Sequence, residues 1–162
     1  MIKLIGAFAQ KNRVIGNKGK IPWHIKEDLL QYKEKTQGQI VLMGDNTYYS
    51  LRNVYYKTRP MPYAKIFIAT IDKNLKITDE LNQTEMVYDL IDFLKNYSGE
   101  DLWVCGGASI YRLSMPYVDE VYASEIKGDF EGDAFFPEFE KDFVLKETIP
   151  YEQFDLKIYK RG

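Results

Sequence analysis

The sequence predicts an α/β fold on a mainly parallel sheet, with an antiparallel C-terminal edge and about four helices. Short apolar runs alternate with helical patterns through most of the chain, which is the order that parallel sheets require. The C-terminal part instead alternates apolar and polar residues over three strand-like segments. Because no linker interrupts the 162 residues, we expect one domain over residues 1–162.

The first half of the chain is expected to contain two strand–helix units. Each strand is a short apolar run, and each helix ends where glycine or a polar loop begins. In chain order the expected elements are a strand at 2–9, a mobile-looking loop at 10–22, a helix from about 25 to 36 that Gln37-Gly38 ends, a strand at 40–43, a helix at 46–51, and a polar loop with tyrosines at 52–59.

The second half continues this pattern and then becomes rich in strands. Its first strand follows the stiff segment Arg59-Pro60-Met61-Pro62. In chain order the expected elements are a strand at 65–70, a short strand ending at 87–88, a helix at 90–97, a strand at 102–105, a helix at 109–114 that Met115-Pro116 stops, and strands at 120–126, 142–149 and 154–160. Ligands of such sheets bind at the carboxyl ends of the strands.

Composition limits the chemistry that this chain can perform. A single cysteine and a single histidine exclude an internal disulfide, a Cys-rich or multi-His metal site, and any nucleophilic triad not built on His24. The net charge of −2 and the scattered basic residues offer no footprint for nucleic acid. No apolar run matches a membrane span or a signal peptide. We expect a cytoplasmic monomer without metal, nucleic-acid or membrane partners, which acts on a small molecule.

One carboxylate falls on the apolar face of the first helix. The residues that share this face at three- and four-residue spacing are Ile25, Asp28, Leu29 and Tyr32. Gln31 falls with the charged residues on the solvated side, and Leu30 does not fit the pattern. A buried carboxylate is unfavourable unless something binds it. An aspartate in a first turn also serves commonly as a helix cap, so this segment alone leaves both interpretations open.

Two strand-to-helix turns have chemistry suited to phosphate, namely Gly44-Asp45-Asn46-Thr47 and Gly106-Gly107-Ala108-Ser109. Each lets the backbone approach a ligand and then presents the N–H groups of a helix start. Neither matches the Rossmann or P-loop pattern, and each alone is typical of an ordinary tight turn. Two of them in one small domain favour a dinucleotide, whose pyrophosphate needs donors from more than one side.

Taken in order, these segments resemble the dihydrofolate reductases over nearly the whole chain. The motifs that carry the resemblance are Ile5-Gly6-Ala7, Arg13-Val14-Ile15-Gly16, Ile21-Pro22-Trp23 with Asp28, Met43-Gly44 with Thr47 and Ser50, Arg59-Pro60-Met61-Pro62, Gly106 to Tyr111, and Gly132-Asp133 with Phe136-Pro137. The resemblance implies an eight-stranded sheet with four helices. It also implies reduction of 7,8-dihydrofolate to tetrahydrofolate, in one-carbon metabolism, by hydride transfer from NADPH to pterin C6 with protonation at N5. The loop 10–22 matches the loop that closes over the nicotinamide.

The same resemblance implies roles for individual residues. Asp28 would bind the 2-amino and N3 edge of the pterin with help from the Ser124 hydroxyl, and Trp23 would order a nearby water. The remaining substrate contacts would be Ile5, Ala7, Leu29, Tyr32 and Leu51. The cofactor contacts would be Ala7, Ile15, Gly16, Asn46, Thr47, Thr70, Cys105, Gly106, Gly107, Ala108, Ser109, Ile110 and Tyr111.

The chain departs from the family pattern at three positions. Ala64 stands where the family has an arginine that binds the glutamate α-carboxylate, and Arg52, Lys57 or Arg59 are candidates to replace it. Asp45 stands where a basic residue commonly binds the 2′-phosphate of the cofactor, which makes use of NADH possible. Ser109 replaces an arginine that several members carry.

Two other functions compete with dihydrofolate reduction. Ala64 favours a reductase of the same fold that acts on a tail-less pterin or a pyrimidine, as in riboflavin precursor reduction. The third possibility is a folate- or nucleotide-binding module without catalysis. Because Trp23, Asp28, Gly106 and Gly107 are all present, the third possibility is the weakest.

Overall fold

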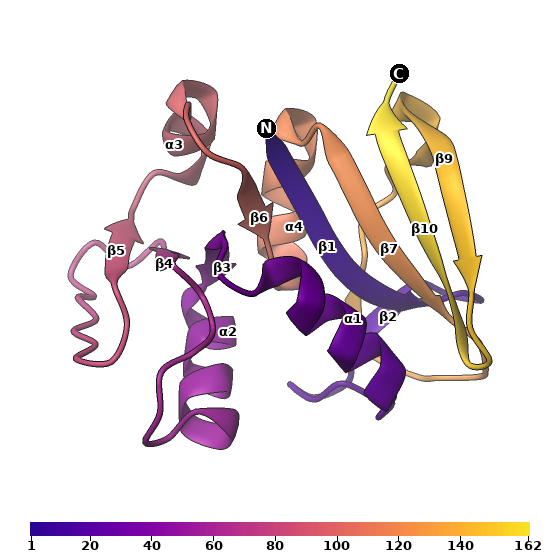
Figure 1. Ribbon diagram of the computed structural model, residues 1–162, viewed down its shortest axis with the longest axis horizontal. Coiled ribbons are helices and arrows are strands. Elements are labelled where there is room, and N and C mark those ends of the chain that lie inside the picture. The colour runs from indigo at the N-terminus through magenta and orange to yellow at the C-terminus, as the bar shows by residue number, and fades with distance from the viewer.

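The computed structural model describes residues 1–162 and contains the elements labelled in Figure 1. The strands are β1 (Ile2–Ala9), β2 (Val14–Gly16), β3 (Ile40–Gly44), β4 (Lys65–Ala69), β5 (Thr84–Val87), β6 (Leu102–Val104), β7 (Glu120–Ile126), β8 (Ala134–Phe135), β9 (Phe143–Pro150) and β10 (Phe154–Arg161). The helices are α1 (Lys26–Thr36), α2 (Asp45–Ser50), α3 (Leu90–Asn96) and α4 (Ala108–Ser114).

Eight strands form one sheet in the order β5-β4-β3-β6-β1-β7-β10-β9. The pairs from β5 to β7 are parallel, whereas β10 is antiparallel to both β7 and β9. The prediction of a mainly parallel sheet with an antiparallel C-terminal edge is therefore confirmed. The chain winds outward from β3 to β5 and then returns through α3 to place β6 between β3 and β1. Strand order reverses there, and this is where open sheets bind ligands.

The two faces of the sheet are buried by different helices. Because side chains alternate along a strand, Leu4 and Phe8 of β1 join one apolar cluster with residues of α3 and α4, whereas Ile5 joins a second cluster with Tyr48 of α2. Tyr32 of α1 packs against the second cluster. In Figure 1, α1 crosses in front of the sheet and α4 lies behind it. The face covered by α1 and α2 is the one on which the predicted substrate residues gather.

Two segments differ from the prediction. The segment 10–22 is not wholly a loop, because β2 pairs with β8 in a second, two-stranded sheet. Gly132 permits this pairing, since a Cβ there would lie 2.3 Å from the Gly16 carbonyl oxygen. The segment 52–59 is also more ordered than predicted, because a π-helical turn, Leu51–Tyr55, continues from α2.

Candidate active site

Asp28 lies in the first turn of α1 and is 9% exposed. Its Oδ1 accepts a hydrogen bond of 2.6 Å from Ser124 Oγ on β7 and one of 3.0 Å from Gln31 Nε2. No protein group donates to Oδ2. This oxygen is not fully buried, so it is open to solvent. The carboxylate bonds across to the sheet rather than to the N–H groups of its own helix, so it is not a helix cap.

The buried face of α1 is rotated relative to the one predicted. Gln31, predicted to be solvated, is 5% exposed, whereas Leu29, predicted to be inward, is 46% exposed. The prediction that Leu29 is buried in the free protein is therefore wrong, although it still flanks Asp28 on the helix. Leu30, the misfit, is exposed as well. The residue that the sequence pattern missed is Gln31, and its three-residue spacing from Asp28 was the available signal.

Several predicted substrate contacts belong to one apolar cluster, against which Tyr32 of α1 packs. Ile5 is buried in one cluster, and Tyr32, Leu51 and Cys105 pack against it as partly buried members. The hydroxyl groups of Tyr32 and Tyr63 lie 2.9 Å apart. Burial raises the pKa of the Cys105 thiol to about 12, so this thiol is neutral near pH 7. Of the predicted substrate contacts, Ile5, Tyr32 and Leu51 therefore come together in this cluster.

Trp23 and Ala7 belong to a third apolar cluster. Both pack against this small cluster, which includes Ile25, and the Trp23 ring meets Phe130 edge-on at 5.1 Å. Ala7 is paired directly with Ser124 across β1 and β7. The strand register thus places Ala7 beside the hydroxyl that bonds to Asp28.

The two predicted glycine turns meet at the carboxyl ends of β3 and β6. The main-chain N–H of Gly44 donates to the Gly106 carbonyl oxygen at 2.9 Å. Gly106 has φ +109°, which favours glycine, and the Gly106-Gly107 peptide bond is cis. A Cβ added at Gly107 would lie 3.7 Å from Thr47 Oγ1, so the starts of α2 and α4 face each other. Backbone groups and a hydroxyl therefore converge where a pyrophosphate needs donors.

Tyr111 connects the second turn to the central strand. Its hydroxyl donates to the Ile5 carbonyl oxygen at 2.9 Å, and burial raises its pKa well above the usual value. A Cβ added at Gly6 would lie 2.8 Å from the Tyr111 oxygen, so this strand position accepts only glycine without a shift. Tyr111, Gly6 and Gly106 therefore form one closely packed unit beneath the predicted nicotinamide site.

The segment that carries Ile15 and Gly16 is attached to the β8 region. The Arg13 guanidinium pairs with Glu140 and donates to the carbonyl oxygens of Phe136 and Pro137. Further along, the main-chain N–H of Lys18 donates to the Asp133 carboxylate. Ile15 packs against the main apolar cluster. The predicted closing loop, residues 10–22, is thus held to the β8 region, and Asn17 to Ile21 within it are largely exposed.

Asp45 occupies the first turn of α2 at the opposite end of the predicted cofactor site. Its Oδ2 accepts a hydrogen bond of 2.8 Å from the Thr70 hydroxyl, and its Oδ1 accepts one of 2.7 Å from the Asn46 main-chain N–H. Ile71, next to Thr70, is 97% exposed. No lysine or arginine pairs with Asp45 in the structure, so this corner carries a negative charge.

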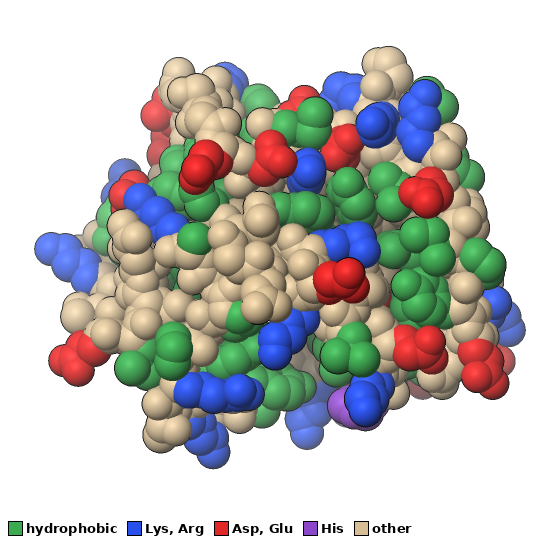
Figure 2. Space-filling model, in the orientation of Figure 1, with side chains coloured by type: hydrophobic (Ala, Val, Ile, Leu, Met, Phe, Trp, Pro, Cys, Tyr) green, Lys and Arg blue, Asp and Glu red, His purple; other side chains and the backbone are tan.

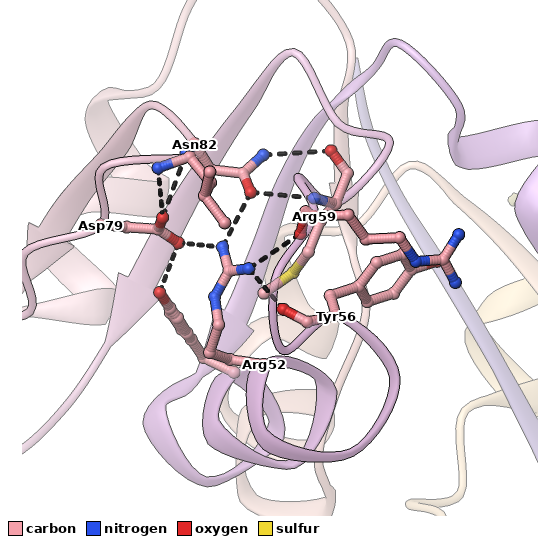
Figure 3. A network of polar contacts seen from close by, with 8 residues as sticks. Arg52, Tyr56, Arg59, Asp79 and Asn82 are labelled. Atoms are coloured by element: carbon pink, nitrogen blue, oxygen red, sulfur yellow. Dashed lines mark hydrogen bonds and ion pairs between the residues drawn. The ribbon is translucent and has the colours of Figure 1, made fainter.

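Figure 3 shows that Arg52 is committed to structure. Its guanidinium pairs with Asp79 and donates to Asn82 Oδ1 and to the carbonyl oxygens of Tyr56 and Arg59. Burial raises the pKa of Asp79, but hydrogen bonds from Tyr48 and Arg52 outweigh this and lower it overall. Arg52 is therefore not free to bind a ligand carboxylate.

The Arg59 side chain points away from that network (Figure 3). Its guanidinium stacks on the Tyr56 ring at 4.8 Å, forms no ion pair, and makes one hydrogen bond of 3.5 Å to the Tyr55 carbonyl oxygen. Ala64 is exposed, and the adjacent Lys65 is engaged with Glu85. Arg59 is thus an accessible cation on a segment whose backbone Arg52 holds in place.

A hollow of about 410 Å³ lies between α2 and residues 76–81, away from Asp28. Basic and acidic side chains are interspersed on the face in Figure 2, and no large patch of one sign forms there. None of the helices has the length and apolar character needed to span a bilayer. No group of three or more His, Cys, Asp or Glu side chains is arranged to hold a metal ion.

Comparison with known proteins gives a consistent result. The family model for dihydrofolate reductase matches residues 1–160. The dihydrofolate reductase of Mycoplasma genitalium is 32% identical over 99% of this chain and 98% of its own length. That of Bacillus subtilis is 36% identical over 87% of this chain and 78% of its own. A solved structure of the dihydrofolate reductase from Enterococcus faecalis, complexed with NADP(H) and RAB-propyl, superimposes with a TM-score of 0.79 and 27% identity, covering 100% of this chain and 96% of the other.

Proposed function

This chain belongs to the dihydrofolate reductase family, and we propose that it reduces 7,8-dihydrofolate to tetrahydrofolate with a hydride from NADPH. The observation that carries this function is the Asp28 carboxylate, which is buried, held at Oδ1 by Ser124 and Gln31, and open at Oδ2. A pterin presents two neighbouring N–H donors along its 2-amino and N3 edge. Charge-assisted hydrogen bonds from those donors satisfy a carboxylate that burial otherwise disfavours.

The remaining substrate residues shape the space around the pterin ring. Ile5, Tyr32 and Leu51 provide apolar walls that exclude water, and Leu29 closes the exposed side of α1 over the bound ring. Ala7 and Ser124 form the floor where β1 and β7 pair. Trp23 is the candidate to hold a water near the ring. The main contribution of these residues is to orient the substrate, which can lower a reaction barrier substantially.

The residues at the two glycine turns fit a dinucleotide. Gly107 lies next to the Thr47 hydroxyl, so main-chain groups of one turn and a hydroxyl of the other face the same space. Asn46, Thr47 and residues 106–110 hold this group, and Ala7, Ile15, Gly16, Cys105 and Tyr111 line the nicotinamide position. When bound, NADPH supplies the hydride that reduces pterin C6. The chain keeps water out and holds the pterin edge while N5 receives its proton.

The glutamate tail of the substrate needs a cation that is not already paired. Arg52 is engaged with Asp79, and Lys65 with Glu85, which leaves Arg59 and Lys57 near the expected tail. Arg59 is the better candidate, because its segment is held by Arg52 and its guanidinium rests on Tyr56, which packs against the same apolar cluster as Tyr32. A guanidinium also binds a carboxylate through two hydrogen bonds.

The test compares dihydrofolate with dihydrobiopterin, which has the pterin ring but no glutamate tail. Oxidation of NADPH by the purified protein is followed with each substrate, and kcat/KM is expected to be higher for dihydrofolate. Replacement of Arg59 (Arg59→Ser) should raise KM for dihydrofolate by about fivefold, as expected for a partly exposed ion pair, and leave dihydrobiopterin unchanged. Lys57→Ser is the matched control and should change neither value.

A second candidate function rests on Ala64. If kcat/KM is equal for the two substrates, the enzyme is a reductase of the same fold that reads only the ring. If neither substrate supports NADPH oxidation, the proposed function is wrong. We further expect a cytoplasmic monomer with no nucleic-acid or membrane partner. Sedimentation of the purified protein tests the oligomeric state.

A further inference from the structure

Gln31 takes part in a closed ring of hydrogen bonds with Asp28 and Ser124. Its Nε2 donates to Asp28 Oδ1 at 3.0 Å and to Ser124 Oγ at 3.3 Å. The Ser124 hydroxyl donates to the same Oδ1 at 2.6 Å. All three residues are buried, and they join α1 to β7 at the point where the predicted substrate edge binds.

The chemistry of the amide fixes which of its ends faces the carboxylate. An ionised carboxylate only accepts hydrogen bonds, so the N–H end of the glutamine must point to it; the reversed amide would place two oxygens against each other. In this orientation Oε1 is fully buried, and no protein group donates to it. An acceptor buried without a donor is unfavourable for folding. Burial of Gln31 therefore leaves one polar atom without a partner, while Nε2 bonds to Asp28 and Ser124.

The ring also fixes the proton of Ser124. Because Gln31 Nε2 can only donate, the serine oxygen is the acceptor in that contact, and its own hydrogen is directed to Asp28 Oδ1. Oδ1 then holds two donors, which is its full capacity, while Oδ2 holds none from the protein. Removing Gln31 leaves Ser124 as the one protein donor to Oδ1 and so leaves the plane of the carboxylate less well defined.

We propose that Gln31 is a positioning residue for Asp28, which keeps Oδ1 bonded to the protein and directs Oδ2 to the N–H groups of the substrate. This inference rests on the proposed function, because it assumes that Asp28 binds the ring. Gln31 does not itself touch the reacting atoms. It acts through the carboxylate, by holding its orientation.

The test replaces Gln31 with methionine (Gln31→Met), which has a similar length but cannot donate. The probe is 2,4-diaminopyrimidine, whose protonated ring offers adjacent N–H donors and a positive charge to a carboxylate. We expect its Kd to rise about tenfold, as for the loss of one hydrogen bond to a charged group. The Kd for NADPH should stay within twofold. The Tm should be equal or higher, because a buried unpaired carbonyl is removed.

The steady-state constants separate positioning from mere packing. Because Gln31 does not touch the reacting atoms and acts on how Asp28 holds the ring, Gln31→Met should raise KM for dihydrofolate about tenfold and change kcat less than about twofold. Gln31→Leu should reproduce this split if the methionine variant fails to fold. Gln37→Met changes an exposed glutamine at the end of the same helix and should leave both constants unchanged.

Three results would overturn the inference. The first is a probe Kd within twofold of the wild type, and the second is an unchanged KM for dihydrofolate in both apolar variants. The third is an equal loss of NADPH and probe affinity, which indicates general damage. Failure of the wild-type protein to bind the probe or to oxidise NADPH would instead reject the proposed function, so the two failures can be told apart.

Discussion

Asp28 and Asp45 are two versions of one arrangement. Each lies in the first turn of its helix, and each accepts a hydrogen bond from a hydroxyl, from Ser124 on β7 at 2.6 Å and from Thr70, directly after β4, at 2.8 Å. They differ at the second oxygen. Asp28 Oδ2 has no protein donor, whereas Asp45 has a donor on each oxygen, with Asn46 N–H on Oδ1. Asp28 is also buried, and Asp45 only partly so.

This difference shows how the same local device serves opposite ends of the ligand site. At Asp28 the free oxygen and low exposure make a strong site for N–H donors. At Asp45 both oxygens are already paired and the charge remains, next to the position where the 2′-phosphate of NADPH is expected. Repulsion there is about a kcal/mol at a partly screened distance. We therefore propose that the first carboxylate binds the substrate and that the second weakens the preference of the protein for NADPH over NADH.

The largest effect should come from removing the charge at Asp28. Asp28→Asn keeps the shape but loses the charged acceptor, so we expect kcat/KM for dihydrofolate to fall by about 100-fold or more, consistent with roughly 3 kcal/mol for a hydrogen bond to a charged group. Asp45→Asn is the matched control and should retain activity. Similar losses in both variants would show that the two aspartates do not have different roles.

The hydroxyl of each pair provides a second, smaller comparison. Ser124→Ala removes a donor from a buried carboxylate and should lower kcat/KM about tenfold. Thr70→Val removes the equivalent donor from a half-buried carboxylate that water can solvate, so cofactor affinity should change less than about threefold. Measured Kd values for NADPH and kcat/KM for dihydrofolate check this order. An equal effect of the two substitutions would contradict it.

The change of cofactor preference at Asp45 is expected to be smaller than the losses of activity at Asp28 and Ser124. Asp45→Arg should tighten NADPH about fivefold more than NADH, because about a kcal/mol of repulsion is removed at the 2′-phosphate. Titration of both cofactors by tryptophan fluorescence, at low and at high salt, measures the ratio. The gain should shrink as salt screens the charge. Equal changes for NADPH and NADH would place Asp45 away from that phosphate.

The order of the main elements follows from local patterns in the sequence. The parallel core strands are apolar runs, such as residues 40–43 and 102–104, and residues typical of turns follow them in the sequence. The short strand β2 was missed, because its partner β8 lies about 120 residues away and neither has an apolar run of its own. Pairing of this kind depends on the sheet that holds both segments, not on their composition.

The sequence by itself determined that a carboxylate would lie on the inner side of the first helix. Only the tertiary structure decided which neighbours are buried with it. At about 100° per residue, Leu29 and Gln31 lie on opposite sides of Asp28, and nothing in the helix indicates which side meets the sheet. Apolar character favoured Leu29. The structure buries Gln31 instead, because its amide donates to Asp28 and Ser124. Ser124 belongs to β7 and lies 96 positions along the chain from Asp28, so no local pattern in the helix indicates this contact.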